Sequence, residues 1–127
     1  MNKEEKQMDK NEWSIDCLGV GFIKSRKSEV AVSDMQDKME AIAYSKRIEL
    51  ANIIVDNTSG ISVDRELIDE LVGWMEKDCI SVLVVRSIYD ITKNVDDLIS
   101  FIKIAQSLGV VIYSIEHNVS ITLEEDN

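Results

Sequence analysis

The chain has 127 residues, 45% of them hydrophobic and 30% charged, and a formal net charge of −10 at pH 7. This length and composition are typical of one globular domain with a single core. No apolar run approaches the ~20 residues of a membrane-spanning helix, and the charged N-terminus lacks the apolar segment of a secretion signal, so we expect a cytoplasmic protein without a membrane anchor. An acidic chain is also a poor DNA binder on its own, because phosphate contacts supply much of the affinity of DNA-binding proteins.

The first elements predicted are a tail, a strand, a helix and a second strand. Residues 1–13 carry charges of both signs and are expected to form a tail, and residues 15–23 are mostly apolar, as in a buried central strand. Apolar side chains at helical spacing follow, with Ser28 or Ser33 as the helix cap and an expected end near Glu49. A short buried strand over residues 53–55 comes next.

A polar turn and a second helix follow this strand. The strand ends at Asp56, and the turn contains Ser59 and Gly60. Asp64 is suited to cap the helix, whose apolar stripe extends to Met75. This arrangement presents a carboxylate at the carboxyl end of a strand, where open α/β sheets usually place their chemistry.

The last third of the chain predicts two strands around a helix, and then a short edge strand. Residues 80–85 form a nearly continuous apolar run, which indicates a strand buried on both faces. Asn94 caps the next helix and Gly109 stops it. Residues 110–115 predict a fourth strand and residues 120–123 a short edge strand.

The alternation of strands and helices over residues 14–123 predicts an α/β fold. Its form is a three-layer, doubly wound, mainly parallel four-stranded sheet with a short edge strand. Residues 124–127 form an acidic tail in this interpretation.

The few metal-ligating and redox-active residues argue against a metal or a cofactor. Cys17 and Cys79 are far apart and lie in or beside apolar runs, so we expect buried, reduced thiols. His117 is the single histidine, and it does not make a zinc site. Gly19 and Gly21 lack the third glycine of a dinucleotide fingerprint.

The sequence DNTSG, followed by DRELIDELV, resembles the middle of the serine recombinase catalytic domain of the resolvase/invertase family. The resemblance extends from about Leu18 to about Val119 and implies a parallel four-stranded core with a small antiparallel edge strand. It also implies an activity, in which a serine hydroxyl attacks a DNA phosphodiester while several arginines stabilise the charge of the transition state.

The resemblance assigns family-site positions to eight residues of this chain: Lys24, Arg26, Gln36, Asp56, Ser59, Arg65, Asp90 and Lys93. Arg26 stands where the nucleophilic serine belongs, and strand alternation is expected to put it on the same face as Phe22 and Lys24. Asp90 stands where an arginine belongs, and Lys93 replaces another arginine. One like charge ~4 Å from a phosphate oxygen costs about 4 kcal/mol at an effective dielectric near 20.

These departures favour a catalytically inactive resolvase-like domain that acts by protein association. The partner would be another copy or an intact serine recombinase. The chain is expected to end before the family's dimer helix and DNA-binding domain, which argues against the family's usual dimer and against sequence-specific DNA contact. An alternative is a divergent phosphodiester-cleaving recombinase that uses Ser25 or Ser28, with DNA binding supplied in trans. A third interpretation is a small anionic ligand bound at Lys24, Arg26 and Arg65.

Overall fold

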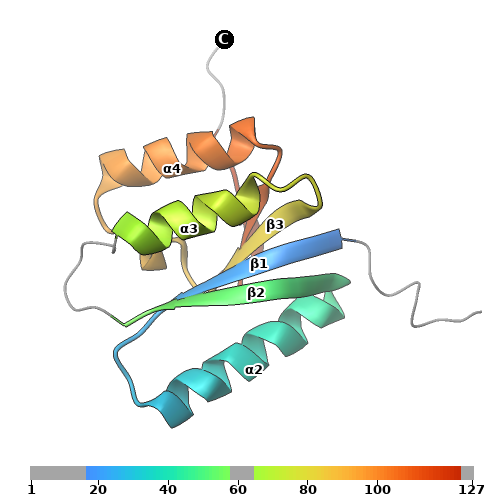
Figure 1. Ribbon diagram of the computed structural model, residues 1–127, viewed down its shortest axis with the longest axis vertical. Coiled ribbons are helices and arrows are strands. Elements are labelled where there is room, and N and C mark those ends of the chain that lie inside the picture. The colour runs from blue at the N-terminus through green and yellow to red at the C-terminus, as the bar shows by residue number, and fades with distance from the viewer. Residues whose placement is uncertain (1–16, 58–64, 124–127) are drawn as a thin grey trace, which may run out of the picture.

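The computed structural model describes residues 17–57 and 65–123, without the side chain of Arg65. Figure 1 shows a twisted sheet with helices on both faces, which confirms the predicted α/β fold. The elements in chain order are β1 Cys17–Lys24, α2 Glu29–Ser45, β2 Ile48–Asp56, α3 Arg65–Met75, β3 Ile80–Val85, the 3-10 turn η1 Ile88–Asp90, α4 Val95–Ser107, β4 Val111–Ser114 and β5 Val119–Ile121. The predicted tails, the Ser59–Gly60 turn and the Asp64 cap lie outside the described residues.

The strand order across the sheet is β2-β1-β3-β4-β5. The first four strands are parallel to their neighbours, whereas β5 pairs antiparallel with β4, as predicted for the edge strand. Helices α3 and α4 lie on one face of the sheet and α2 lies on the other (Figure 1). The core is accordingly divided in two, with Phe22 and Leu83 in the larger cluster and Ile23 and Val84 in the smaller one beneath α2.

The central strand β1 packs closely against β3. A Cβ atom at Gly19 would lie 2.6 Å from Val82 Cγ1 and 2.9 Å from the Val82 carbonyl oxygen. Since one of these neighbours is backbone, it cannot move aside at low cost. This close approach fixes the spacing of the two strands whose carboxyl ends form the site described below.

The predicted boundary between the first helix and the second strand was wrong. Helix α2 ends at Ser45, and Arg47 adopts a left-handed conformation with φ of 67°. The chain then enters β2 at Ile48, so the predicted three-residue strand is in fact nine residues long. An exposed edge strand alternates buried and exposed positions, and only its last part has the continuous apolar pattern by which it was predicted.

The expectation of two buried cysteines was also wrong. Cys17 is half-buried and Cys79 is exposed, and both are free thiols. Cys79 lies in the turn before β3 rather than in the apolar strand that follows it. Among the described residues, no helix is both long and apolar enough to cross a membrane.

Candidate functional site

The carboxyl ends of β1 and β2 place a lysine against a buried carboxylate. Lys24 and Asp56 are neighbours in the parallel register, and Lys24 Nζ lies 3.3 Å from Asp56 Oδ2. The Asp56 side chain is fully buried, and that of Lys24 is 15% exposed. A buried carboxylate requires a countercharge and hydrogen bonds, so this ion pair makes Lys24 part of the sheet's edge.

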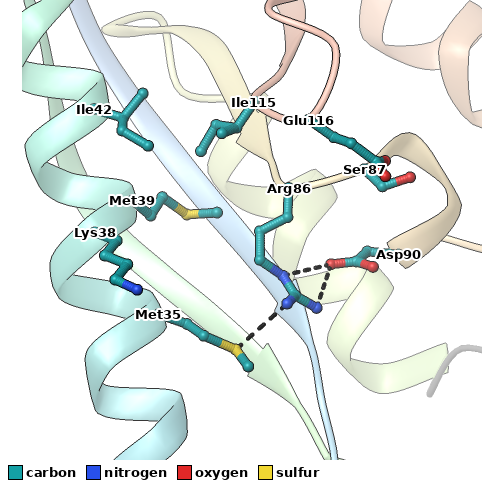
Figure 2. A pocket seen from close by; sticks show the side chains of 9 residues that line it. All are labelled: Met35, Lys38, Met39, Ile42, Arg86, Ser87, Asp90, Ile115 and Glu116. Atoms are coloured by element: carbon teal, nitrogen blue, oxygen red, sulfur yellow. Dashed lines mark hydrogen bonds and ion pairs between the residues drawn. The ribbon is translucent and has the colours of Figure 1, made fainter.

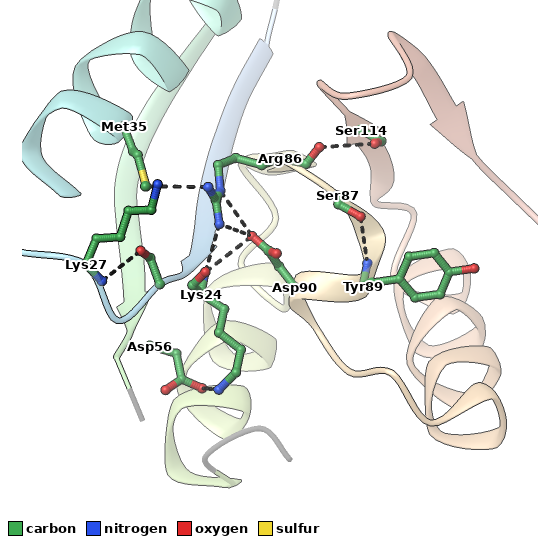
Figure 3. A network of polar contacts seen from close by, with 10 residues as sticks. Lys24, Lys27, Met35, Asp56, Arg86, Ser87, Tyr89, Asp90 and Ser114 are labelled. Atoms are coloured by element: carbon green, nitrogen blue, oxygen red, sulfur yellow. Dashed lines mark hydrogen bonds and ion pairs between the residues drawn. The ribbon is translucent and has the colours of Figure 1, made fainter. Parts of the chain in front are cut away.

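Next to this pair, Arg86 and Asp90 link the end of β3 to the end of β1 (Figure 3). Arg86 Nη2 lies 3.2 Å from Asp90 Oδ2, and Arg86 Nε donates to the same oxygen at 3.3 Å. The guanidinium also donates to the Lys24 carbonyl oxygen at 2.8 Å, while the Lys24 backbone N–H donates to Asp90 Oδ2 at 3.3 Å. We call Lys24, Arg86 and Asp90 the edge network.

Arg86 has a further contact on the other side of the edge network. Its Nη1 lies 3.5 Å from the sulfur of Met35 on α2, as Figure 3 shows. The guanidinium is therefore directed at a carboxylate, a carbonyl and a thioether of its own chain. Such a planar fork orients several acceptors at once, which a lysine at this position could not do.

The structure does not place Arg26 on the face predicted for it. Strand β1 ends at Lys24, and the Ser25 backbone N–H donates to the Asp56 carbonyl oxygen at 2.9 Å. Because the chain leaves the sheet there, strand alternation does not extend to Arg26, whose side chain is exposed.

Both hydroxyl groups of the alternative hypothesis accept local hydrogen bonds. Ser25 is buried, and its Oγ accepts from the Lys27 N–H at 3.2 Å. Ser28 is the N-cap of α2, as predicted, and its Oγ accepts from the Ala31 N–H at 3.2 Å. These contacts give each serine a part in the turn that connects β1 to α2.

The remaining predicted positions are divided between two hollows of the surface. Lys93 is exposed and lines one hollow together with Lys24 and Asp90. Gln36 lines a separate hollow beside Lys27, between α2 and the end of β2. Ser59 and the side chain of Arg65 lie outside what the structure describes. The structure thus brings Lys24, Asp56 and Asp90 together at one edge, but it does not bring Gln36 or Arg26 to them.

Sequence reasoning missed Arg86, which connects most of these groups. The available signal was its position four residues before Asp90, a spacing at which opposite charges can meet across one turn. In the described parts of the chain, no group of three histidine, cysteine or carboxylate side chains is arranged to hold a metal ion.

The fold is similar to catalytic domains of known recombinases. A resolvase family site-specific recombinase from Streptococcus pneumoniae matches with a TM-score of 0.65 and 19% identity, over 83% of this chain and 76% of that chain. The N-terminal catalytic domain of TP901-1 integrase matches with a TM-score of 0.65 and 14% identity, over 79% of each chain. The C-terminal catalytic domain of ISC1926 TnpA, an IS607-like serine recombinase, matches with a TM-score of 0.68 and 15% identity, over 78% of this chain and 70% of that chain.

Comparison with curated proteins finds no match. The sequence model of the family described as "Resolvase, N terminal domain" matches residues 25–127 of this chain. This match covers most of the chain and agrees with the sheet order and the fold similarities. The chain therefore belongs to the resolvase N-terminal domain family.

Proposed function

We propose that this domain is a catalytically inactive resolvase-like protein that acts by association, either with another copy of itself or with an intact serine recombinase. The observation that carries the proposal is the edge network. A carboxylate, Asp90, lies at the position where the family resemblance requires an arginine, and it is held there by Arg86 and the Lys24 backbone.

The charges at this edge oppose phosphate binding. Cleavage of a phosphodiester places extra negative charge on the phosphorus-bound oxygens, which converging cations must stabilise. Here Arg86 is engaged by Asp90, and Lys24 is engaged by the buried Asp56. A phosphate at ~4 Å from Asp90 would meet a repulsion of about 4 kcal/mol at an effective dielectric near 20.

The hydroxyl groups also argue against cleavage. The nucleophile position is occupied by Arg26, which has no oxygen to attack with and is exposed beyond the end of β1. Ser28 has the ordinary function of a helix cap, and Ser25 is buried within its turn. The alternative of a divergent enzyme that uses Ser25 or Ser28 is therefore supported less well.

A cleavage assay tests the inactivity. The protein is incubated with nicked half-site DNA under conditions in which an active serine recombinase forms a covalent serine–DNA adduct. We expect no adduct, and we expect the Ser25→Ala and Ser28→Ala variants to behave like the wild type. An adduct that one of these substitutions abolishes would establish the divergent enzyme instead.

The association is tested by mixing the protein with an intact serine recombinase encoded in the same genome. Light scattering after size exclusion measures the mass of the mixture, and a recombination assay measures activity with and without the protein. We expect either a complex with altered recombination or a homo-oligomer. A monomer that leaves every recombinase of that genome unaffected would refute the association.

A further inference from the structure

The outer side of strand β2 is an edge of the sheet, and no described strand pairs with it there. The Asp56 carbonyl oxygen accepts from the Ser25 N–H, so the backbone of Asp56 faces β1. Because the backbone groups of successive residues in a strand point to opposite sides, those of Ile54 also face β1, whereas those of Ile53 and Val55 face outward. These two residues therefore present N–H donors and C=O acceptors at the edge of the sheet.

The two edges of the sheet differ in how open they are to another strand. The edge strand β5 has three residues, and the Leu123 N–H that follows it donates to the Gln106 side chain of α4 at 2.8 Å. Strand β2 has nine residues and contains neither proline nor lysine, which often blunt edge strands. Its register with β1 is interrupted at Ala51, which has no partner there. The regular stretch Asn52–Asp56 is therefore the part of either edge best suited to pair with a further strand.

Helix α2 lies over one face of β2 and leaves space at the outer side of the strand. Figure 2 shows Met39 on α2 directed toward Arg86 and Ile115, which follow β3 and β4 on the far side of β1. On the opposite flank of α2, a hollow of about 220 Å³ lies between the helix and the end of β2, beside Val55. Its lining includes one cation and one carboxylate, Lys27 and Glu29. A further chain beside Val55 thus meets open space and charges of both signs.

We propose that β2 pairs antiparallel with β2 of a second copy of this chain, about a two-fold axis between the two Ile54 residues. In this register the outward groups of Ile53 meet those of Val55 in the other copy, and each such pair exchanges both of its N–H···O bonds. The side chains of Ile53 and Val55 pack against the core cluster beneath α2, and the pairing joins the two clusters into one row. A second copy fits because the pairing stretch is complementary to itself under this rotation. This inference gives a surface to the association proposed above and rests on it.

The charges of the pairing stretch favour this register. Asp56 stands opposite Asn52 of the other copy, so a carboxylate faces an amide that can donate to it. The register one step toward the end of β2 would set Asp56 against the apolar side chain of Ile54. The register one step toward its start would set the irregular Ala51 against Val55. Of these three registers, the proposed one alone pairs the two outward residues with each other and gives the carboxylate a polar neighbour.

Sedimentation of the full chain over a concentration series tests the inference. The pairing buries little surface, so we expect a reversible dimer with a Kd of roughly 10–100 µM. Hydrogen exchange, followed by NMR, reports on the edge itself. The amides of Ile53 and Val55 are expected to exchange more slowly as the dimer forms, whereas exchange of the Ile54 amide, which faces β1, does not change. A mass that stays monomeric up to ~1 mM, or Ile53 and Val55 amides that are protected already in the monomer, would overturn the proposal.

Matched variants locate the pairing surface. Val55→Pro removes an outward N–H without taking a bond from β1, and we expect it to raise the Kd by at least about tenfold. Val55→Thr keeps the N–H and the shape, and is its control. Asn52→Asp sets two carboxylates opposite each other and is expected to raise the Kd about fivefold, whereas Lys103→Gln on α4 changes the net charge equally and leaves the Kd unchanged. If Val55→Pro does not fold, Asn52→Asp and the amide exchange still decide. A Kd that neither Val55→Pro nor Asn52→Asp alters would contradict the pairing.

The outcomes separate this inference from the proposed function. If the wild type is monomeric but binds an intact recombinase, the β2 pairing fails and the association stands. If Val55→Pro dissociates the dimer but the wild type forms a covalent serine–DNA adduct, the pairing stands and the proposed inactivity fails. A monomer that binds no recombinase would refute both.

Discussion

The edge network makes a measurable prediction for Asp90. The Asp90→Ala substitution removes the acceptor of the Lys24 backbone N–H and the counterion of Arg86. Asp90 is 16% exposed, so its hydrogen bonds are shielded from water, whereas Arg86 is 36% exposed and can be partly rehydrated. A hydrogen bond to a charged group contributes about 1.5–3 kcal/mol, and a partly exposed ion pair adds about 0.5 kcal/mol. We therefore expect Asp90→Ala to lower the free energy of unfolding by about 2 kcal/mol.

The Asp90→Asn substitution separates the two contributions. The amide keeps an acceptor for the Lys24 N–H but loses the charge that faces Arg86, so we expect a loss of about 1 kcal/mol. Urea unfolding measures both values, provided that the dependence on denaturant concentration is unchanged. The control is Asp37→Asn on the exposed side of α2, which should stay within about 0.5 kcal/mol of the wild type. A cost for Asp90→Ala no larger than that of the control would refute the edge network.

Four further substitutions test the backbone and the helix cap, each by urea unfolding. Gly19→Ala forces a Cβ against Val82, including its carbonyl oxygen at 2.9 Å, and is expected to cost about 3 kcal/mol. Gly73 lies on the exposed side of α3, and no atom lies within 4 Å of a Cβ added there. Gly73→Ala should therefore stabilise the protein by about 0.5–1 kcal/mol. A loss of stability would contradict the difference in packing between Gly73 and Gly19. Arg47→Gly relieves the left-handed conformation at φ 67° and should stabilise by about 0.5–1 kcal/mol, whereas a loss would show that the arginine's contacts outweigh its strain. Ser28→Ala removes the cap of α2 and should cost about 1 kcal/mol, and an unchanged free energy of unfolding would contradict a stabilising cap.

The fold was predictable where local chemistry and periodicity agree. Asn94 caps α4 through the Asp97 N–H, and Gly109 has a positive φ of 75° just past the helix, as its position in the sequence indicates. The end of α2 was not predictable in this way. The left-handed residue there is Arg47 rather than a glycine, so the sequence has no stop signal, and the helix was extended into β2.

The sequence predicted which residues lie near the edge of the sheet, but not which of their side chains pair with one another. Asp56 at the end of β2 could be expected to face the edge of the sheet, but its pairing with Lys24 depends on the register between β1 and β2. The partnership of Asp90 with Arg86 depends on η1, a single 3-10 turn that no periodicity of the sequence predicts. Interactions of this kind arise from tertiary geometry, which periodicity does not report.

The edge network also explains how the fold tolerates a carboxylate at position 90. In isolation, a partly buried Asp90 at the end of the sheet would be costly, because few waters can solvate it. Arg86, four residues earlier and just past the end of β3, supplies the countercharge, and the Lys24 N–H supplies a hydrogen bond from the neighbouring strand. The polar groups at the edge thus stabilise one another and hold β1 to β3. A phosphate entering this edge could reach the Arg86 guanidinium only by displacing Asp90 from it, so the interactions that stabilise the fold here oppose anion binding at Arg86.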